Sequence, residues 1–330
     1  MEKTKIPYYE DMTRISNSNI GWFLKKGPAY LRNMLDGKEE GLSLPQLAKG
    51  TMIHEYLLQP EEFQKDYVVW DAPQPKSSQE TKFCEELATT TEIEPDKAVL
   101  SAYKAAYRTT GQSESKMLSE GLKKASTLNL YIQSIKENDK RIKISPYTMN
   151  KLMELSEVCN KHKKARELLA DDHASDILTY HEFHINWELC GVKCKSLLDC
   201  VKFDVIHKTI ILMDIKTTSH LYSFEDSMRE FDYLRQLCFY TLALKWYIET
   251  ELYDNPEDWT FKWYIVGISN DWSNQVRVFE FTSDQVYSRI ETIYKALQEI
   301  QWHQRTNNWD YYSSYYESDG AEKLNLRVNC

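Results

Sequence analysis

The chain has 330 residues, of which 42% are hydrophobic and 28% are charged, a balance typical of a folded globular protein. Lysine and arginine together number 41 against 50 aspartates and glutamates, so the formal net charge is −9. These values exclude a disordered chain and a protein coated with positive charge, but they allow a local basic groove.

Neither a membrane span nor a signal peptide is indicated. No apolar run is long enough to cross a bilayer, and the segment MEKTKIPYYEDMTR lacks the apolar core of a signal peptide. We therefore expect a cytoplasmic protein with no membrane partner. Seven cysteines without a Cys-x-x-Cys pair predict reduced thiols. Cys190, Cys194 and Cys200 cluster, but no fourth ligand lies nearby, which favours strand-filling residues over a metal or iron–sulfur site.

The first part of the chain is predicted to be helical. Ser16 and Ser18 are candidate N-caps of a first helix, and Pro28 suits the first turn of a second. A third helix is predicted over Pro45–Leu58, and Tyr67–Trp70 has the residue types of a short strand.

The rest of the chain divides into a helical block and an alternating block. Helix formers dominate residues 97–170, which we predict to be a helical insertion within a single domain spanning residues 1–330. Beyond it, strands bracketed by helices predict an α/β fold with a three-layer core, a central mixed β-sheet flanked by helices. The predicted strands cover 177–187, 192–203, 209–216, 261–268 and 275–281, and the predicted helices cover 231–248 and 283–305.

Two aspartates stand among apolar residues in the second and third of these strands. If the strands form a hairpin centred between Ile206 and His207, Asp199 and Asp214 lie opposite each other on one face. Lys216, two residues beyond Asp214, points to the same face. Two carboxylates so close repel each other unless a cation lies between them, and Mg²⁺ prefers oxygen ligands. The spacing indicates a magnesium site beside an amine. A buried Asp–Lys ion pair with a turn-capping aspartate is the alternative.

These residues match a known signature. The pattern Asp199 … Asp214-Ile215-Lys216 resembles that of the PD-(D/E)XK nucleases, with Leu198 where the family often has proline. Three further segments are similar to RecE-type and RecB-type exonucleases. They are ISNSNIGWFLKKGPAYLRNMLDG at 15–37, GTMIHEYLLQPEEFQKDYVV at 50–69, whose His54 matches a metal-site histidine, and FDYLRQLCFYTLAL at 231–244, whose Gln236 and Tyr240 match a Gln-x-x-x-Tyr helix.

The resemblance implies a restriction-endonuclease-like fold and phosphodiester hydrolysis with Mg²⁺, or with Mn²⁺ as a substitute. It assigns the positioning of the attacking water to Lys216, and Glu182 in the first strand is a further candidate. The implied metal ligands are His54, Asp199, Asp214 and the backbone carbonyl of Ile215, and the implied catalytic residues are Asp199, Asp214, Lys216, Gln236 and Tyr240.

RecE-like nucleases degrade linear duplex DNA from 5′ ends and pass the exposed strand to a single-strand annealing protein, and some form rings. By resemblance we expect a phage- or prophage-encoded 5′-to-3′ exonuclease of recombination or repair. Its expected partners are duplex DNA ends, an annealing protein and copies of itself in a ring.

The expected DNA contacts are lysines, because phosphate binding requires local positive charge. The candidates are Lys193, Lys195 and the group Lys161–Arg166. Two alternatives stay open: a structure-specific or single-strand endonuclease on the same fold, and a non-catalytic DNA-binding module.

Overall fold

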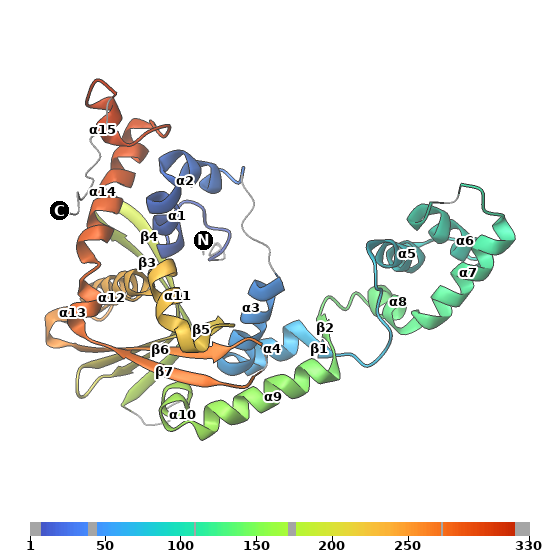
Figure 1. Cartoon of the computed structure of the whole chain (residues 1–330), viewed down its shortest axis with the longest axis horizontal. Helices are drawn as coiled ribbons and strands as arrows, with labels where there is room; N and C mark the ends of the chain where they lie inside the picture. The colour runs from blue at the N-terminus through green and yellow to red at the C-terminus, as the bar shows by residue number, and fades with distance from the viewer. Residues whose placement is uncertain (1–7, 39–44, 109, 171–175, 272, 321–330) are drawn as a thin grey trace. The chain divides into compact units, whose positions relative to one another are not determined.

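A computed structural model describes residues 8–38, 45–108, 110–170, 176–271 and 273–320 (Figure 1). Contacts between residues divide the chain into two compact units. One consists of Met1–Gln59 with Met153–Cys330, and the other of Pro60–Leu152. The predicted insertion at 97–170 overlaps the second unit from 97 to 152, and the prediction of a single domain stays a prediction.

The first unit is built on a five-stranded mixed sheet, which confirms the predicted α/β fold. Its strand order is β3-β4-β5-β6-β7, and neighbouring strands are antiparallel except for the parallel pair β5–β6. The strands are β3 (Ile177–Leu189), β4 (Val192–Asp204), β5 (Thr209–Thr218), β6 (Thr260–Ser269) and β7 (Val276–Phe281).

Helices cover both faces of this sheet and complete the three layers (Figure 1). On one face, apolar residues such as Val201 and Phe203 of β4 share a buried core with α12 (Tyr233–Thr250) and α14 (Ile290–Thr306). On the other face, the ammonium of Lys202 donates to backbone carbonyls of Glu167 and Ala170, at 3.0 and 2.6 Å, at the end of α10 (Lys163–Leu169). Alternate residues of β4 thus face opposite helical layers.

The remaining elements of the first unit surround this core. The predicted helix over 283–305 is divided in two, because Ser288 and Arg289 interrupt it between α13 and α14. The helices are α1 (Asn17–Lys26), α2 (Pro28–Leu35), α3 (Pro45–Leu58), α11 (Phe224–Phe231), α13 (Ser283–Tyr287), α15 (Ser313–Tyr316) and the 3₁₀ turns Leu221–Ser223 and Pro256–Asp258, while α9 (Pro146–Lys161) begins in the second unit.

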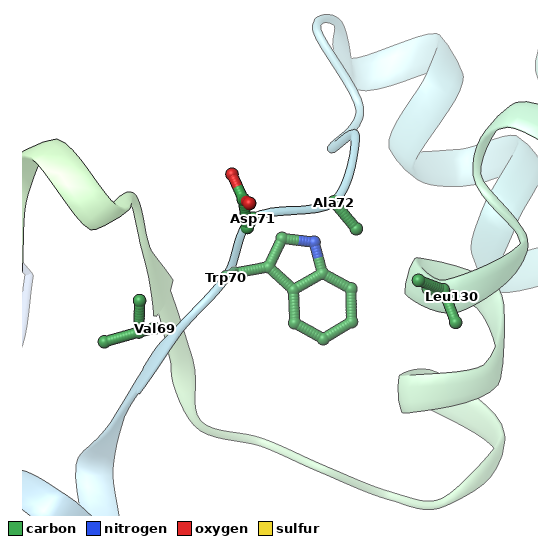
Figure 2. A pocket seen from close by; sticks show the side chains of 5 residues that line it. All are labelled: Val69, Trp70, Asp71, Ala72 and Leu130. Atoms are coloured by element: carbon green, nitrogen blue, oxygen red, sulfur yellow. The ribbon is translucent and has the colours of Figure 1, made fainter.

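The second unit packs four helices around a small core of its own, which includes Phe83, Tyr103 and Ile132. It also contains the parallel strand pair β1–β2, of which β2 lies in the block predicted to be helical. Beside this pair an open pocket of about 420 Å³ is lined by Val69, Trp70, Asp71, Ala72 and Leu130 (Figure 2). The elements are α4 (Pro60–Asp66), β1 (Tyr67–Val69), α5 (Ser78–Thr89), α6 (Pro95–Ala106), α7 (Glu114–Thr127), α8 (Asn129–Lys136) and β2 (Ile142–Ile144).

Within the described ranges, every helix is too short or too polar to cross a lipid bilayer.

Candidate active site

Three carboxylates lie in line across β3, β4 and β5. The last β4–β5 pair joins Cys200 to Met213, and the same register sets Asp199 opposite Asp214. This is the hairpin register that the sequence predicts. The β3–β4 pairing in turn sets Glu182 opposite Asp199. The three acidic side chains therefore converge from adjacent strands.

The pairing of the strands is interrupted at this row. Glu182 is skipped in the β3–β4 ladder and has a φ of +48°, a left-handed conformation that is uncommon for residues other than glycine. The backbone N–H of Ile215 in β5 donates to Asp199 Oδ2 at 2.7 Å. Toward the start of β4, β5 no longer pairs with it, and Ile15 is the neighbour instead. The backbone N–H of Ile15 donates to the carbonyl of Lys193 at 2.9 Å. The site thus lies where β5 separates from β4.

The candidate metal-binding cluster consists of His54, Glu182 and Asp199. One ligand atom from each lies within 4.8 Å of the others, and His54 Nδ1 is 3.5 Å from Asp199 Oδ2. Helix α3 reaches β5 closely enough because Gly50 has no side chain; a Cβ there would lie 3.0 Å from Thr217 Oγ1. An imidazole with two carboxylates is a donor set that divalent cations accept, so these residues fit a metal ion.

Asp214 is held by side chains from β5 and α12. Its carboxylate is 1% exposed, and Oδ2 lies 2.6 Å from the ammonium of Lys216. Gln236 Nε2 donates to Asp214 Oδ1 at 2.9 Å and to the Tyr240 hydroxyl at 3.0 Å. Gln236 and Tyr240 stand one turn apart on α12, so one helix face supports the carboxylate.

The structure therefore brings together every residue of the hairpin, α3 and α12 that was predicted to be catalytic or to bind metal. The backbone of Ile215 adds to this cluster, because it hydrogen-bonds the imidazole of His54 as well as Asp199. Metal binding by Asp214 and by the Ile215 carbonyl stays a prediction.

Burial makes the carboxylates resist ionisation. It raises the pKa of Glu182 to about 8, and the charges of Asp199 and Asp214 add to the effect. Burial also raises the pKa of Asp199, and it raises the pKa of Asp214 to about 6 although Lys216 opposes it. A bound cation would reverse these shifts, because it favours the charged forms.

The neighbouring bases respond in opposite ways. Burial lowers the pKa of Lys216, but Asp214 and Asp199 outweigh this and raise it above its ordinary value, so the side chain is an ammonium at neutral pH. Burial, with a contribution from Lys216, lowers the pKa of His54 to about 4. His54 is therefore a neutral imidazole, the form that binds metals.

The two lysines of β4 that were predicted to contact DNA differ. Lys193 is exposed and stays a candidate. Lys195 is 5% exposed, and its ammonium donates to the backbone carbonyls of Tyr8 and Asp11, each at 2.6 Å. The structure therefore corrects the prediction for Lys195, whose charge holds the segment before α1 instead of facing a phosphate.

In the group Lys161–Arg166, two of the charges are engaged by neighbouring acids. Lys161 pairs with Glu157 and Lys164 with Glu167, each at 2.7 Å, which is ordinary surface pairing. Their contact with DNA stays a prediction.

The position of Glu182 opposite Asp199 has a signal in the sequence. Cys190 and Gly191 both have positive φ, 53° and 71°, and form the two-residue turn between β3 and β4. Counting outward from this turn sets Glu182 opposite Asp199. Gly191 in the sequence thus marks the turn of a second hairpin, β3–β4, and this turn sets which residue of β3 faces Asp199.

Neither a protein-family model nor a curated protein matches the chain. Among solved structures, the fold is similar to the crystal structure of a “putative exonuclease” from Eubacterium rectale, with a TM-score of 0.50 and 11% sequence identity. The similarity covers 93% of this chain and 88% of that chain. At 11% identity the similarity shows the fold alone, and it agrees with a three-layer core in which helices flank a mixed sheet.

Proposed function

We propose that the protein is a metal-dependent deoxyribonuclease that degrades linear duplex DNA from its ends, in the 5′-to-3′ direction. The observation that carries this proposal is the row of Glu182, Asp199 and Asp214 beside the ammonium of Lys216 and the imidazole of His54. The name of the structural neighbour, an exonuclease, agrees with the reaction.

His54, Glu182 and Asp199 would hold Mg²⁺, or Mn²⁺ in its place, and Asp214 is the further ligand that the sequence predicts. When bound, the cation would polarise a phosphoryl oxygen and lower the pKa of a water molecule. The neutral state of His54 suits this role without loss of a proton.

Lys216 acts as a cation in this proposal, not as a base. Its ammonium lies 2.6 Å from Asp214 Oδ2, and the two aspartates keep it protonated. It can therefore orient an attacking water molecule and stabilise negative charge that develops on the phosphate. Gln236 fixes one oxygen of Asp214, which directs the other toward Lys216.

The proposed substrate is duplex DNA, although the net charge of the chain is −9. Binding would depend on a local group of cations that includes Lys193 and would weaken steeply with added salt. A role in phage-type recombination, an annealing partner and a ring of subunits stay predictions from the resemblance.

The test is a digestion assay with linear duplexes labelled at either the 5′ or the 3′ end, compared with a covalently closed circle. We expect loss of linear DNA only with Mg²⁺ or Mn²⁺, with the 5′ label lost first and the circle intact. Cleavage of the circle would favour the endonuclease alternative. Intact DNA of both forms with either metal would contradict a nuclease and favour a non-catalytic DNA-binding module.

A further inference from the structure

A stack of four aromatic rings leads from the core of the first unit to its surface. Phe224 in α11 stacks on Phe279 in β7, with ring centroids 4.7 Å apart and 11° between the planes. Tyr233 at the start of α12 follows, 5.8 Å from Phe224, and Phe231 lies 5.8 Å from Tyr233. Phe224 is 2% exposed, whereas Phe231 is 51% exposed. The outermost ring thus lies in solvent against the partly buried Tyr233, which in turn packs on the buried Phe224.

The turn between α11 and α12 sets the orientation of the two outer rings. Asp232, between them in sequence, has a φ of +50°, in the left-handed region. Arg289 Nε donates to Asp232 Oδ1 at 2.8 Å, and Arg235 Nη1 lies 3.8 Å from Oδ2. The rings of Phe231 and Tyr233 are consequently within 18° of parallel. Asp232 is the left-handed C-cap of α11, and its contacts with the two arginines fix the turn between the two rings.

The stack passes beside the candidate active site. The ammonium of Lys216 lies 5.2 Å from the centroid of the Tyr233 ring. At the outer end, the ammonium of Lys25 in α1 lies 5.8 Å from the Phe231 centroid and donates to the carbonyl of Glu230 at 2.6 Å. The exposed part of the stack therefore has an amine at each end, one catalytic in our proposal and one at the surface.

Two of the three acidic residues of α11 are paired within the helix. Glu225 and Asp226 both pair with Arg229, at 3.3 and 3.1 Å. The third, Glu230, directly precedes Phe231, and its negative charge acts on Tyr233. The cations that lie over the two outer rings are Lys25 and Lys216.

We infer that Phe231, with Tyr233 and Lys25, forms a nucleobase subsite that stacks an unpaired base of the DNA strand beside the scissile phosphate. The inference rests on the proposed function. Every nucleobase has a flat face that stacks on an aromatic ring, and an amine beside the ring meets the adjoining phosphate. Rings whose planes are already fixed bind a base at a low cost in conformational entropy.

The test compares Phe231→Ala and Phe231→Trp with a matched control, Tyr253→Ala. Tyr253 is 89% exposed and follows the opposite end of α12, about 27 Å along the helix axis. Single-turnover cleavage is measured on a natural linear duplex and on one whose terminal three nucleotides in the cleaved strand are abasic. Equilibrium binding is followed in EDTA with 2-aminopurine at those positions.

We expect Phe231→Ala to slow cleavage of the natural duplex by about tenfold, the size of one lost base–aromatic stack. Phe231→Trp, which keeps a flat ring at this position, should cleave faster than Phe231→Ala, and Tyr253→Ala should leave the rate unchanged. On the abasic duplex, wild type and Phe231→Ala should cleave at the same reduced rate. The 2-aminopurine fluorescence should change on binding to wild type and to Tyr253→Ala, but not to Phe231→Ala.

Two results would overturn the subsite while the nuclease proposal stands. One is an unchanged rate for Phe231→Ala on the natural duplex, as expected if this surface docks another protein. The other is an equal slowing by Phe231→Ala on both duplexes. A wild-type protein that cleaves neither duplex with Mg²⁺ or Mn²⁺ would instead overturn the proposed function.

Discussion

The β4–β5 hairpin has a cluster of charged side chains at each end, and the two clusters are built in opposite ways. At the turn, Lys208 Nζ lies 2.8 Å from Asp254 Oδ2, and Asp204 accepts a hydrogen bond from the backbone N–H of His207 at 3.0 Å. The hydrogen bond from Lys208 is the main reason why the pKa of Asp254 is lowered, and the backbone hydrogen bond from His207 is the main reason for Asp204.

At the other end, the carboxylates are buried and their pKa values are raised. Burial is the largest cause for Glu182, Asp199 and Asp214, and the ammonium of Lys216 offsets it only in part. The turn cluster is therefore neutralised by side chains of the chain itself. The row of Glu182, Asp199 and Asp214 is not neutralised in this way. Acidic groups that are held together against their mutual repulsion indicate a binding site for a cation.

The largest expected effect separates the two clusters by activity. Asp214→Ala or Lys216→Ala should reduce DNA cleavage by about 1000-fold, because each removes a group aimed at the reacting phosphate or its metal. Asp254→Ala, at the turn, should cleave at the wild-type rate. Single-turnover digestion of an end-labelled duplex with Mg²⁺ measures this. Equal losses in all three variants would mean that the row has no special role.

The second effect concerns metal binding and pH. Glu182 has a pKa of about 8 in the metal-free protein, so at lower pH its proton must leave when a metal binds. The affinity for Mn²⁺ should therefore rise by up to about tenfold per pH unit between pH 6 and 8 and then level off. Calorimetric titration at several pH values checks this. A pH-independent affinity of the wild type, or the same slope in Glu182→Gln, would contradict it.

The third effect is on stability without metal. A carboxyl whose pKa is raised from 4.5 to about 8 on folding binds more protons in the folded state, so the free energy of unfolding falls as pH rises through this window. The metal-free protein should lose about 2–4 °C in Tm between pH 5 and 8, and Glu182→Gln should lose less. Asp254 has the opposite pH dependence. Its pKa is lowered on folding, so its contribution to the free energy of unfolding is present at neutral pH and is lost as pH falls. Thermal unfolding scans of wild type, Glu182→Gln and Asp254→Asn test both signs.

The smallest effects distinguish the two lysines of β4. Lys195→Met should lower the free energy of unfolding by about 2 kcal/mol, because it removes two charge-assisted hydrogen bonds to backbone carbonyls. Lys193→Ala should leave the free energy of unfolding unchanged and weaken DNA binding. The slope of the logarithm of affinity against the logarithm of salt concentration should fall by about 1, the value for one lost phosphate contact. Urea denaturation and salt-dependent binding isotherms measure these. Loss of DNA affinity only in Lys195→Met would reverse the two roles.

The sequence predicted the β4–β5 side of the site well, because a short hairpin has a local symmetry. The position of its turn fixes which residues face each other, so Asp199, Asp214 and Lys216 follow from counting alone. The face of α12 that carries Gln236 and Tyr240 likewise follows from helical spacing.

Other features depend on contacts between distant segments and were not predictable in this way. Lys195 turns inward because the segment around Ile15 lies along β4, and nothing near Lys195 in sequence signals this. The strand Ile142–Ile144 forms in a helix-rich block because its parallel partner, Tyr67–Val69, lies far away along the chain. Parallel pairing of this kind leaves no local turn to mark it.

The central claim is that the carboxylate row binds a divalent cation, and anomalous diffraction from crystals soaked in Mn²⁺ tests it most directly. We predict an anomalous peak within bonding distance of Asp199 and Glu182, next to the imidazole of His54, and its disappearance in Asp199→Ala. A map of the wild type without a peak at this row, or with Mn²⁺ bound only elsewhere, would contradict the account.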